Sequence, residues 1–145
     1  MNVATILGVK GDEVVTIRPA AVLSEAAAAL RDRRIGALVV SDDGRRITGI
    51  LSERDVVLAL ASHGASALGR TVASAMSPDV VTCRVDDAVE TLMAQMTERR
   101  IRHLPVVDVD GSLRGIVSIG DVVKARLGQL ESENQALHDY MHQGR

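Results

Sequence analysis

The sequence contains very few aromatic residues and one cysteine. Phe and Trp are absent, and Tyr140 is the only residue of the Phe, Trp and Tyr class among 145. Unpaired nucleic-acid bases bind proteins by stacking on aromatic side chains, so this absence argues against single-stranded RNA or DNA as a partner. The lone Cys83 excludes an internal disulfide and metal sites built from several thiolates.

Long hydrophobic runs and an excess of one charge are also missing. No apolar run approaches the roughly 20 residues that span a bilayer, and the first five residues contain no basic segment followed by an apolar stretch. The formal net charge is −2, with 25% charged residues, so no electrostatic signature indicates nucleic acid or an anionic membrane. We therefore expect a cytoplasmic protein that binds neither nucleic acid nor a membrane.

An internal repeat is present instead. The segment Gly49-Ile50-Leu51-Ser52-Glu53-Arg54-Asp55 returns 66 residues later as Gly115-Ile116-Val117-Ser118-Ile119-Gly120-Asp121. Aligning residues 14–60 with 80–126 gives about 18 identities in 47 positions without a gap. Each half is too small to bury a good core alone. Two copies therefore predict a pseudo-twofold pair that folds together.

Each copy predicts the element order β-α-β-β-α. Short β-branched and apolar runs predict strands, and stretches rich in Ala, Leu, Met and Gln predict helices. Turns rich in Asp and Gly separate the second strand from the third. The expected strands are 14–17, 37–40 and 47–51 in copy one and 80–83, 104–107 and 113–117 in copy two; the expected helices are 22–31 and 56–61, then 88–98 and from 122 onward.

These elements predict an α/β (α+β) fold in which two pseudo-twofold-related repeats pack sheet to sheet, followed by a C-terminal helix. A short helical stretch is expected before each copy, and Asp86-Asp87 is the expected N-cap of the helix at 88–98. The predicted divisions are a first repeat at 2–62, a small-residue linker at 63–70, a second repeat at 71–127 and a helical tail at 128–145.

The doubled Gly-h-h-Ser-x-x-Asp motif, where h is hydrophobic, the Val-Val-Thr strands and the stretch Arg-Ile-Arg-His-Leu-Pro-Val-Val at 100–107 resemble the cystathionine-β-synthase (CBS) domain family. The likeness covers residues 2–127 and is closest to a stand-alone tandem pair, called a Bateman module. It implies a regulatory module that binds adenosine-containing ligands such as AMP, ATP, NAD or S-adenosylmethionine in clefts between the repeats. It also implies a homodimer in which two pairs form a disc.

The Ser-x-x-Asp residues have two interpretations. A helix N-terminus offers unpaired N–H groups to an anion, so Ser52 and Ser118 can hold a phosphate while Asp55 and Asp121 accept hydrogen bonds from ribose hydroxyls. Alternatively, the serines are N-caps and the aspartates are first-turn carboxylates that stabilise the helix. The duplication and the resemblance favour the ligand interpretation.

An adenine ring needs a flat apolar slot, which must be aliphatic here because aromatic residues are scarce. For each candidate, ordinary core packing is the alternative. The candidates are Thr16, Ile17, Ala37, Leu38 and Ile50 in copy one, and Thr82, Cys83, Ile101, Leu104, Pro105 and Ile116 in copy two.

The two clefts are expected to be unequal. Copy two has Arg102 and His103 before its central strand, where the resemblance implies cations against a phosphate, whereas copy one has Gly36 and Ala37. The cleft with Ser118, Asp121, Arg102 and His103 is therefore the first choice for a phosphorylated ligand, with Arg54 able to reach either cleft or to remain a solvated charge. His103 is also a candidate for pH-dependent affinity.

The tail carries a heptad pattern. Val123, Leu127, Leu130, Asn134, Leu137 and Met141 are spaced alternately by four and three residues. An asparagine at an a position fixes register in parallel two-stranded coils, so the tail is expected to aid homodimerisation, unless the helix lies on its own domain or frays.

Two rival functions remain open. A ligand-free protein-interaction adaptor needs the Ser-x-x-Asp residues only as caps, and a nucleotide-processing enzyme would need a catalytic constellation. We expect no catalytic residues, catalytic cofactor or metal site, although His138 and His142 have metal-chelating spacing. The regulated partner is not identified by the sequence.

Overall fold

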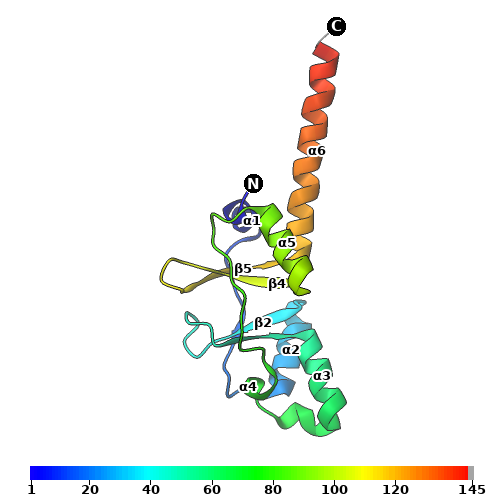
Figure 1. Cartoon of the computed structure of the whole chain (residues 1–145). Coiled ribbons are helices and arrows are strands. Elements are labelled where there is room, and N and C mark those ends of the chain that lie inside the picture. The colour runs from blue at the N-terminus through cyan, green and yellow to red at the C-terminus, as the bar shows by residue number, and fades with distance from the viewer. Residues whose placement is uncertain (144–145) are drawn as a thin grey trace.

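The structure is a computed structural model that describes residues 1–143. It confirms the α/β fold of two repeats with small sheets and a long C-terminal helix (Figure 1). The first half contains α1 Val3–Lys10, β1 Thr16–Ile17, α2 Leu23–Arg33, β2 Ala37–Val40, β3 Gly49–Ser52 and α3 Glu53–His63. The second half contains η1 Gly64–Gly69, α4 Val72–Ala75, α5 Val89–Arg99, β4 His103–Val107, β5 Leu113–Ser118 and α6 Ile119–Gln143.

The two sheets have equivalent hairpins but unequal first strands. In the first repeat, β1 pairs parallel to β2, and β2 pairs antiparallel to β3 with Ala37 opposite Ser52. In the second repeat, β4 pairs antiparallel to β5 with His103 opposite Ser118. The strand expected at 80–83 is reduced to a parallel bridge between Cys83 and Val106. The hairpin registers therefore place residues 37 and 103 beside the two motif serines.

Each repeat has its own hydrophobic core, and the short N-terminal helices exchange between them. Val3 and Ile6 of α1 are buried with Leu104 and Val117 in the core of the second repeat. Conversely, Val72 of α4 is buried in the core of the first repeat. The chain thus enters through the second core before it forms the first repeat, and the predicted divisions at 2–62 and 71–127 stay a prediction.

Two local expectations differ from the structure. The N-cap of α5 is Ala88, without a side-chain cap, because Asp87 instead accepts a hydrogen bond from the backbone N–H of Arg84 at 2.8 Å. The small-residue segment at 63–70 forms the 3₁₀ helix η1, and Ala67 within it is fully buried. Its lack of large side chains therefore reflects close packing.

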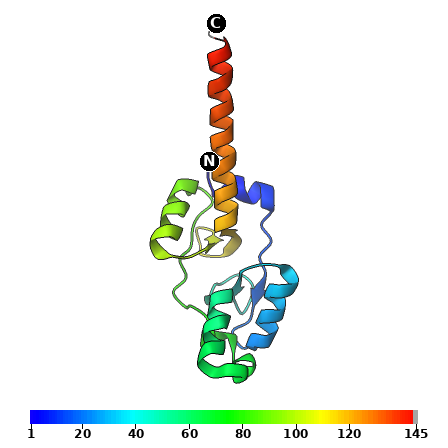
Figure 2. The same ribbon diagram turned by 90° about the vertical axis from the view of Figure 1, so that its right-hand side faces the viewer.

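The two small sheets face one another, and the longer helices lie on one side of them (Figure 1). The hairpin loops also touch, since the N–H of Leu113 donates to the Arg45 carbonyl at 2.8 Å. Beyond its first turns, α6 extends away from both repeats (Figure 2). The residues that connect the two sheets therefore lie where the repeats meet, and α6 points away from that junction.

Candidate functional site

Both Ser-x-x-Asp motifs form capping boxes at the starts of α3 and α6. Asp55 Oδ2 accepts from the Ser52 backbone N–H at 2.9 Å and from its hydroxyl at 3.1 Å, while Ser52 Oγ accepts from the Asp55 N–H at 3.3 Å. Ser118 and Asp121 repeat the two backbone contacts at 3.1 and 2.9 Å. Each box fixes its carboxylate through one oxygen, and Oδ1 lies outside the box.

Lys10 distinguishes the second box from the first. Its ammonium donates to Asp121 Oδ2 at 2.7 Å and to the Ile116 carbonyl at 3.0 Å, joining the end of α1 to β5 and α6. The side chains of Lys10 and Asp121 are 31% and 24% exposed. A partly exposed ion pair contributes at most about 1 kcal/mol, so a ligand can displace Lys10 from the carboxylate at little cost.

A cavity of about 500 Å³ lies between the repeats beside Lys10. That volume falls within the range of small-molecule sites. The first repeat supplies most of its wall, and the second repeat supplies His103, Ile116 and Ser118. The complete lining is Lys10, Glu13, Val14, Val15, Arg33, Arg34, Ile35, Gly36, Ala37, His103, Ile116 and Ser118.

His103 crosses from the second repeat to the backbone of the first. A Cβ built on Gly36 would lie 3.0 Å from His103 Cε1 and 3.0 Å from Glu53 Oε1. Only a residue without a side chain fits at this position. The repeats therefore differ at 36–37 and 102–103 because the small pair in one makes room for the imidazole of the other.

The equivalent region of the first repeat is arranged differently. Met76, which lies 66 residues after Lys10, packs against Gly49. Both backbone groups of Ile50 pair with Ser77, at 3.0 and 2.9 Å. Ser77 thus covers the edge of β3, whereas Lys10 binds the matching carbonyl of β5 through a side chain that can move.

Several expected adenine-slot residues lie inside the cores. Ile17 and Leu38 are buried in the first core, and Cys83 and Leu104 are buried in the second. Pro105 is buried in β4, and its carbonyl accepts from the Cys83 N–H at 2.9 Å. Of the expected site residues, the cavity brings together Ala37, His103, Ile116 and Ser118, and Asp121 joins them through Lys10.

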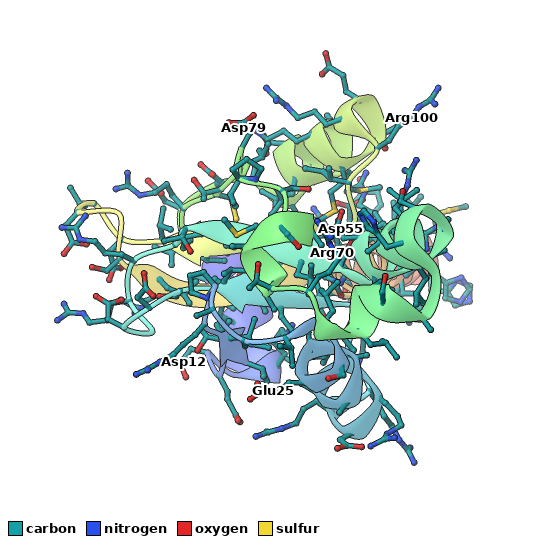
Figure 3. The ribbon with its side chains drawn as sticks, turned by 90° about the horizontal axis from the view of Figure 1, so that it is seen from below. Asp12, Glu25, Asp55, Arg70, Asp79 and Arg100 are labelled. Atoms are coloured by element: carbon teal, nitrogen blue, oxygen red, sulfur yellow. The ribbon has the colours of Figure 1, made fainter. Side chains whose placement is uncertain are left out.

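The remaining expected residues lie outside this cavity. Arg102 and Arg54 are exposed, at the starts of β4 and α3. Asp55 begins α3 away from the periphery, where Asp12, Glu25, Asp79 and Arg100 lie (Figure 3). The others outside the cavity lining are Thr16, Ile50, Ser52, Thr82 and Ile101.

Local charges set the protonation states of three groups. Burial acts to raise the pKa of Asp121, but the hydrogen bond from Lys10 and the Ser118 N–H outweigh it, so that pKa is below its ordinary value. The pKa of His103 is lowered by burial and by the charge of Lys10, against the opposing effect of Glu53. Burial, reinforced by Asp87, raises the pKa of Cys83 to about 12, which makes the thiol unreactive at neutral pH.

The family is decided by a match along both repeats. A family model described as CBS domain matches residues 9–62 and 72–128. The chain belongs to the CBS domain family. Within it, a CBS-domain containing protein of known structure from Agrobacterium tumefaciens is 45% identical, with a TM-score of 0.84, and the match covers 87% of this chain and 99% of that one.

Other CBS proteins vary in length and in what they bind. CBS domain-containing protein YhcV of Bacillus subtilis is 32% identical over 90% of this chain and 91% of YhcV, whereas this chain spans only 57 to 68% of three other curated relatives. The CBS pair of protein MJ0100 was solved with 5′-methylthioadenosine and S-adenosyl-L-methionine; it is 26% identical, with a TM-score of 0.79, over 89% of this chain and 98% of that one. CBSX2, solved with AMP, is 29% identical, with a TM-score of 0.70, over 81% and 90%.

Sequence reasoning missed Lys10 and the arginines of the cavity. Lys10 follows a short helix that the repeat alignment does not include, and Met76 stands at its equivalent position. Arg34 has a left-handed backbone with a φ of 53°, as does its repeat equivalent Arg100 at 54°. The duplicated Arg-Arg-Ile was a usable signal, because a non-glycine residue in this conformation is uncommon.

Two further searches concern the described residues alone. Among residues 1–143, no group of three or more His, Cys, Asp or Glu side chains is arranged to hold a metal ion. The rings of His138 and His142 are 4.2 Å apart on α6. In the same part of the chain, no helix combines the length and apolar character needed to cross a membrane.

The fit of His103 against Gly36 can be tested by overpacking. We expect Gly36→Val to lower the free energy of unfolding by about 1–3 kcal/mol, because its side chain meets the imidazole. Adding His103→Ala should recover much of that loss, as measured by urea denaturation. Gly8→Val is the control, since nothing lies within 4 Å of a Cβ at Gly8; additive effects of Gly36→Val and His103→Ala would contradict the contact.

Proposed function

We propose that the chain is a regulatory module that binds an adenosine nucleotide in the cavity between its repeats. The observation that carries this proposal is the convergence of Lys10, Asp121 and Ser118 at one end of a 500 Å³ cavity. This end offers a carboxylate for a diol, together with a cation and a helix N-terminus for an anion. A ribose that carries phosphate presents both of these groups.

Each of these side chains would have a separate role. Asp121 would accept hydrogen bonds from the ribose hydroxyls through the oxygen outside its capping box. Lys10, displaced from the carboxylate, would bind the phosphate together with Ser118 at the start of α6. His103 stands opposite Ser118 in the β4–β5 register, so its imidazole is also available to the phosphate.

The aliphatic wall of the same cavity would hold the adenine ring. Val14, Val15, Ile35, Ala37 and Ile116 contribute apolar surface there. Arg33 pairs with Glu13 at 3.5 Å at the same cavity, so its charge is partly compensated. A flat apolar ring at one end and an anion at the other would match this distribution of side chains.

The first repeat would provide a weaker second site. Ser52 and Asp55 form the same box as Ser118 and Asp121, and the expected partners Arg54, Thr82, Ile101 and Arg102 belong to this side. Met76 replaces the cation, however, and Ser77 covers Ile50. A phosphorylated ligand should therefore fill the Lys10 cavity first.

Regulation would follow from the cavity having walls from both repeats. A ligand that contacts Lys10 and Ile35 on one side and Ser118 on the other favours one relative orientation of the repeats. A partner protein that binds this surface would respond, provided that the ligand has different affinities for the two orientations. The ligands named for MJ0100 and CBSX2 support an adenosyl compound.

The rest of the proposal concerns the setting of the module. It would act without catalysis or a catalytic cofactor, as a homodimer in the cytoplasm, on a partner that is not identified. The family match to two CBS domains, and the near end-to-end match to the small relative YhcV, support a binding role over an enzymatic one.

A ligand-free interaction adaptor is the second candidate. The observation that favours it is that both capping boxes are complete in this structure, so the motif residues already have a structural role. The cavity and Lys10 are not explained by capping, which is why the nucleotide module is preferred.

Thermal unfolding with a panel of AMP, ADP, ATP, NAD, NADH and S-adenosylmethionine tests the proposed function. A ligand at 100 times its dissociation constant should add about 2.7 kcal/mol to the free energy of unfolding, which raises the melting temperature by roughly 5–10 °C in a chain of this size. Guanosine nucleotides serve as the control. Equal behaviour with every compound would favour the adaptor, and product formed from ATP or NAD would favour an enzyme.

Replacing the cation of the cavity should discriminate between phosphorylated and unphosphorylated ligands. We expect Lys10→Met, which introduces the residue found at position 76, to weaken AMP binding about tenfold or more, since a charge-assisted hydrogen bond contributes about 1.5–3 kcal/mol. Adenosine binding should change much less. Titration calorimetry measures both, with Lys124→Met as the control at the other lysine of the chain; an equal loss for AMP and adenosine would remove Lys10 from phosphate binding.

AMP affinity should increase as pH falls from 8 to 6. The lowered pKa of His103 keeps its ring neutral in the free protein, and a phosphate beside it favours the imidazolium, so binding takes up a proton. Each pKa unit gained on binding corresponds to up to about tenfold in affinity. His103→Gln should lose this part of the pH dependence, whereas the titration of AMP itself affects both proteins. Identical pH profiles for the two proteins would exclude His103 as the sensor.

A further inference from the structure

The outer part of α6 exposes an apolar stripe at heptad spacing. Leu127, Leu130 and Leu137 are 44 to 58% exposed, and Met141 is 64% exposed. They lie on the segment that extends away from both repeats (Figures 1 and 2). We call the set Val123, Leu127, Leu130, Asn134, Leu137 and Met141 the α6 seam.

Packing within the chain supports only the first turns of α6. Val122 is its buried residue, and Arg126 reaches Glu90 of α5 at 3.3 Å. The segment from 127 to 143 is about 25 Å long at 1.5 Å per residue. A single helix of that length is marginal in water, and Gly128 weakens it by about 1 kcal/mol relative to alanine. A stable α6 therefore needs a partner along its seam.

We propose that the α6 seam pairs with the same seam of a second copy as a parallel, in-register two-stranded coiled coil. Leu127, Asn134 and Met141 take the a positions, and Val123, Leu130 and Leu137 take the d positions. In this arrangement Asn134 faces Asn134 of the second copy, where two amides can hydrogen-bond across the seam. The inference specifies the homodimer proposed above and does not depend on the ligand.

The flanking charges favour the parallel orientation. A residue at position g faces the e position five residues later in a parallel partner. Arg126 then meets Glu131 of the second copy, and Glu133 meets His138 of the second copy, which pairs groups of opposite or compatible charge.

The antiparallel arrangement is disfavoured by the same residues. In the register that best overlaps the two seams, Asn134 would face Leu130 of the second copy, leaving a buried amide without a partner. Glu131 and Glu133 would then each lie beside the same glutamate of the second copy. Both effects oppose this orientation, since like charges on neighbouring helices repel.

Parallel pairing also determines how the modules are arranged. Because α6 continues directly from β5, two parallel copies of α6 bring the two second repeats together. Val57 of α3 and Val123 of α6 are repeat-equivalent and both exposed, at 61% and 43%. The like repeats of the two copies would therefore lie side by side along their helical faces.

Cysteine cross-linking of the full-length chain tests this pairing. In the parallel coil, residue 137 lies next to its own copy, so Leu137→Cys should form a disulfide-linked dimer about tenfold or more faster than Ser132→Cys, which lies on the outer face. Wild type, whose buried Cys83 is unreactive, is the background control. Circular dichroism checks that both variants fold.

The outcomes separate the alternatives. If Leu137→Cys links no faster than Ser132→Cys, α6 does not pair as proposed. If a mixture of Leu127→Cys and Leu137→Cys chains forms mainly the mixed product, the coil is antiparallel and the inference is overturned. Thermal shifts with AMP, measured on the same variants, keep the tests distinct, because a failed cross-link with a retained shift refutes the pairing alone.

Discussion

The packing of His103 against Gly36 is the contact on which the asymmetry of the molecule depends. A pseudo-twofold axis would place identical side chains against each other where the repeats meet, and two imidazoles cannot occupy the space that one fills. The first repeat therefore has Gly36 and Ala37 where the second has Arg102 and His103. Once the small pair lies in one repeat, the regions around the two motifs can no longer be equivalent.

The same inequality extends to the groups that would bind a ligand. Both motifs use serine and aspartate to start a helix, so these side chains are held rigidly before any ligand arrives. Only the second carboxylate has a lysine beside it, because α1 crosses to the second core and ends next to β5. The exchange of the N-terminal helices thus gives one region a mobile cation, whereas the backbone of Ser77 covers the edge of the other.

The repeat, the hairpins, the helices and the capping serines could be predicted because each depends on neighbouring residues. The strand at 80–83 was overestimated, since β-branched residues do not decide whether a partner strand is present. Continuous apolar strands also conceal which side chains face the core, so Leu38 and Leu104 were grouped with the cavity residue Ala37. Lys10 was missed because its contact with Asp121 spans 111 residues, and the alignment of the repeats pairs it with Met76.

A crystal structure grown with saturating AMP would test the central claim most directly, because it locates the ligand relative to Lys10. We expect the phosphate beside Lys10 and Ser118, the ribose hydroxyls on Asp121 and the base against the aliphatic wall formed by Val14, Ile35 and Ile116. An empty cavity at saturating AMP, with Lys10 still bound to Asp121, would contradict the account. So would AMP bound only beside Asp55.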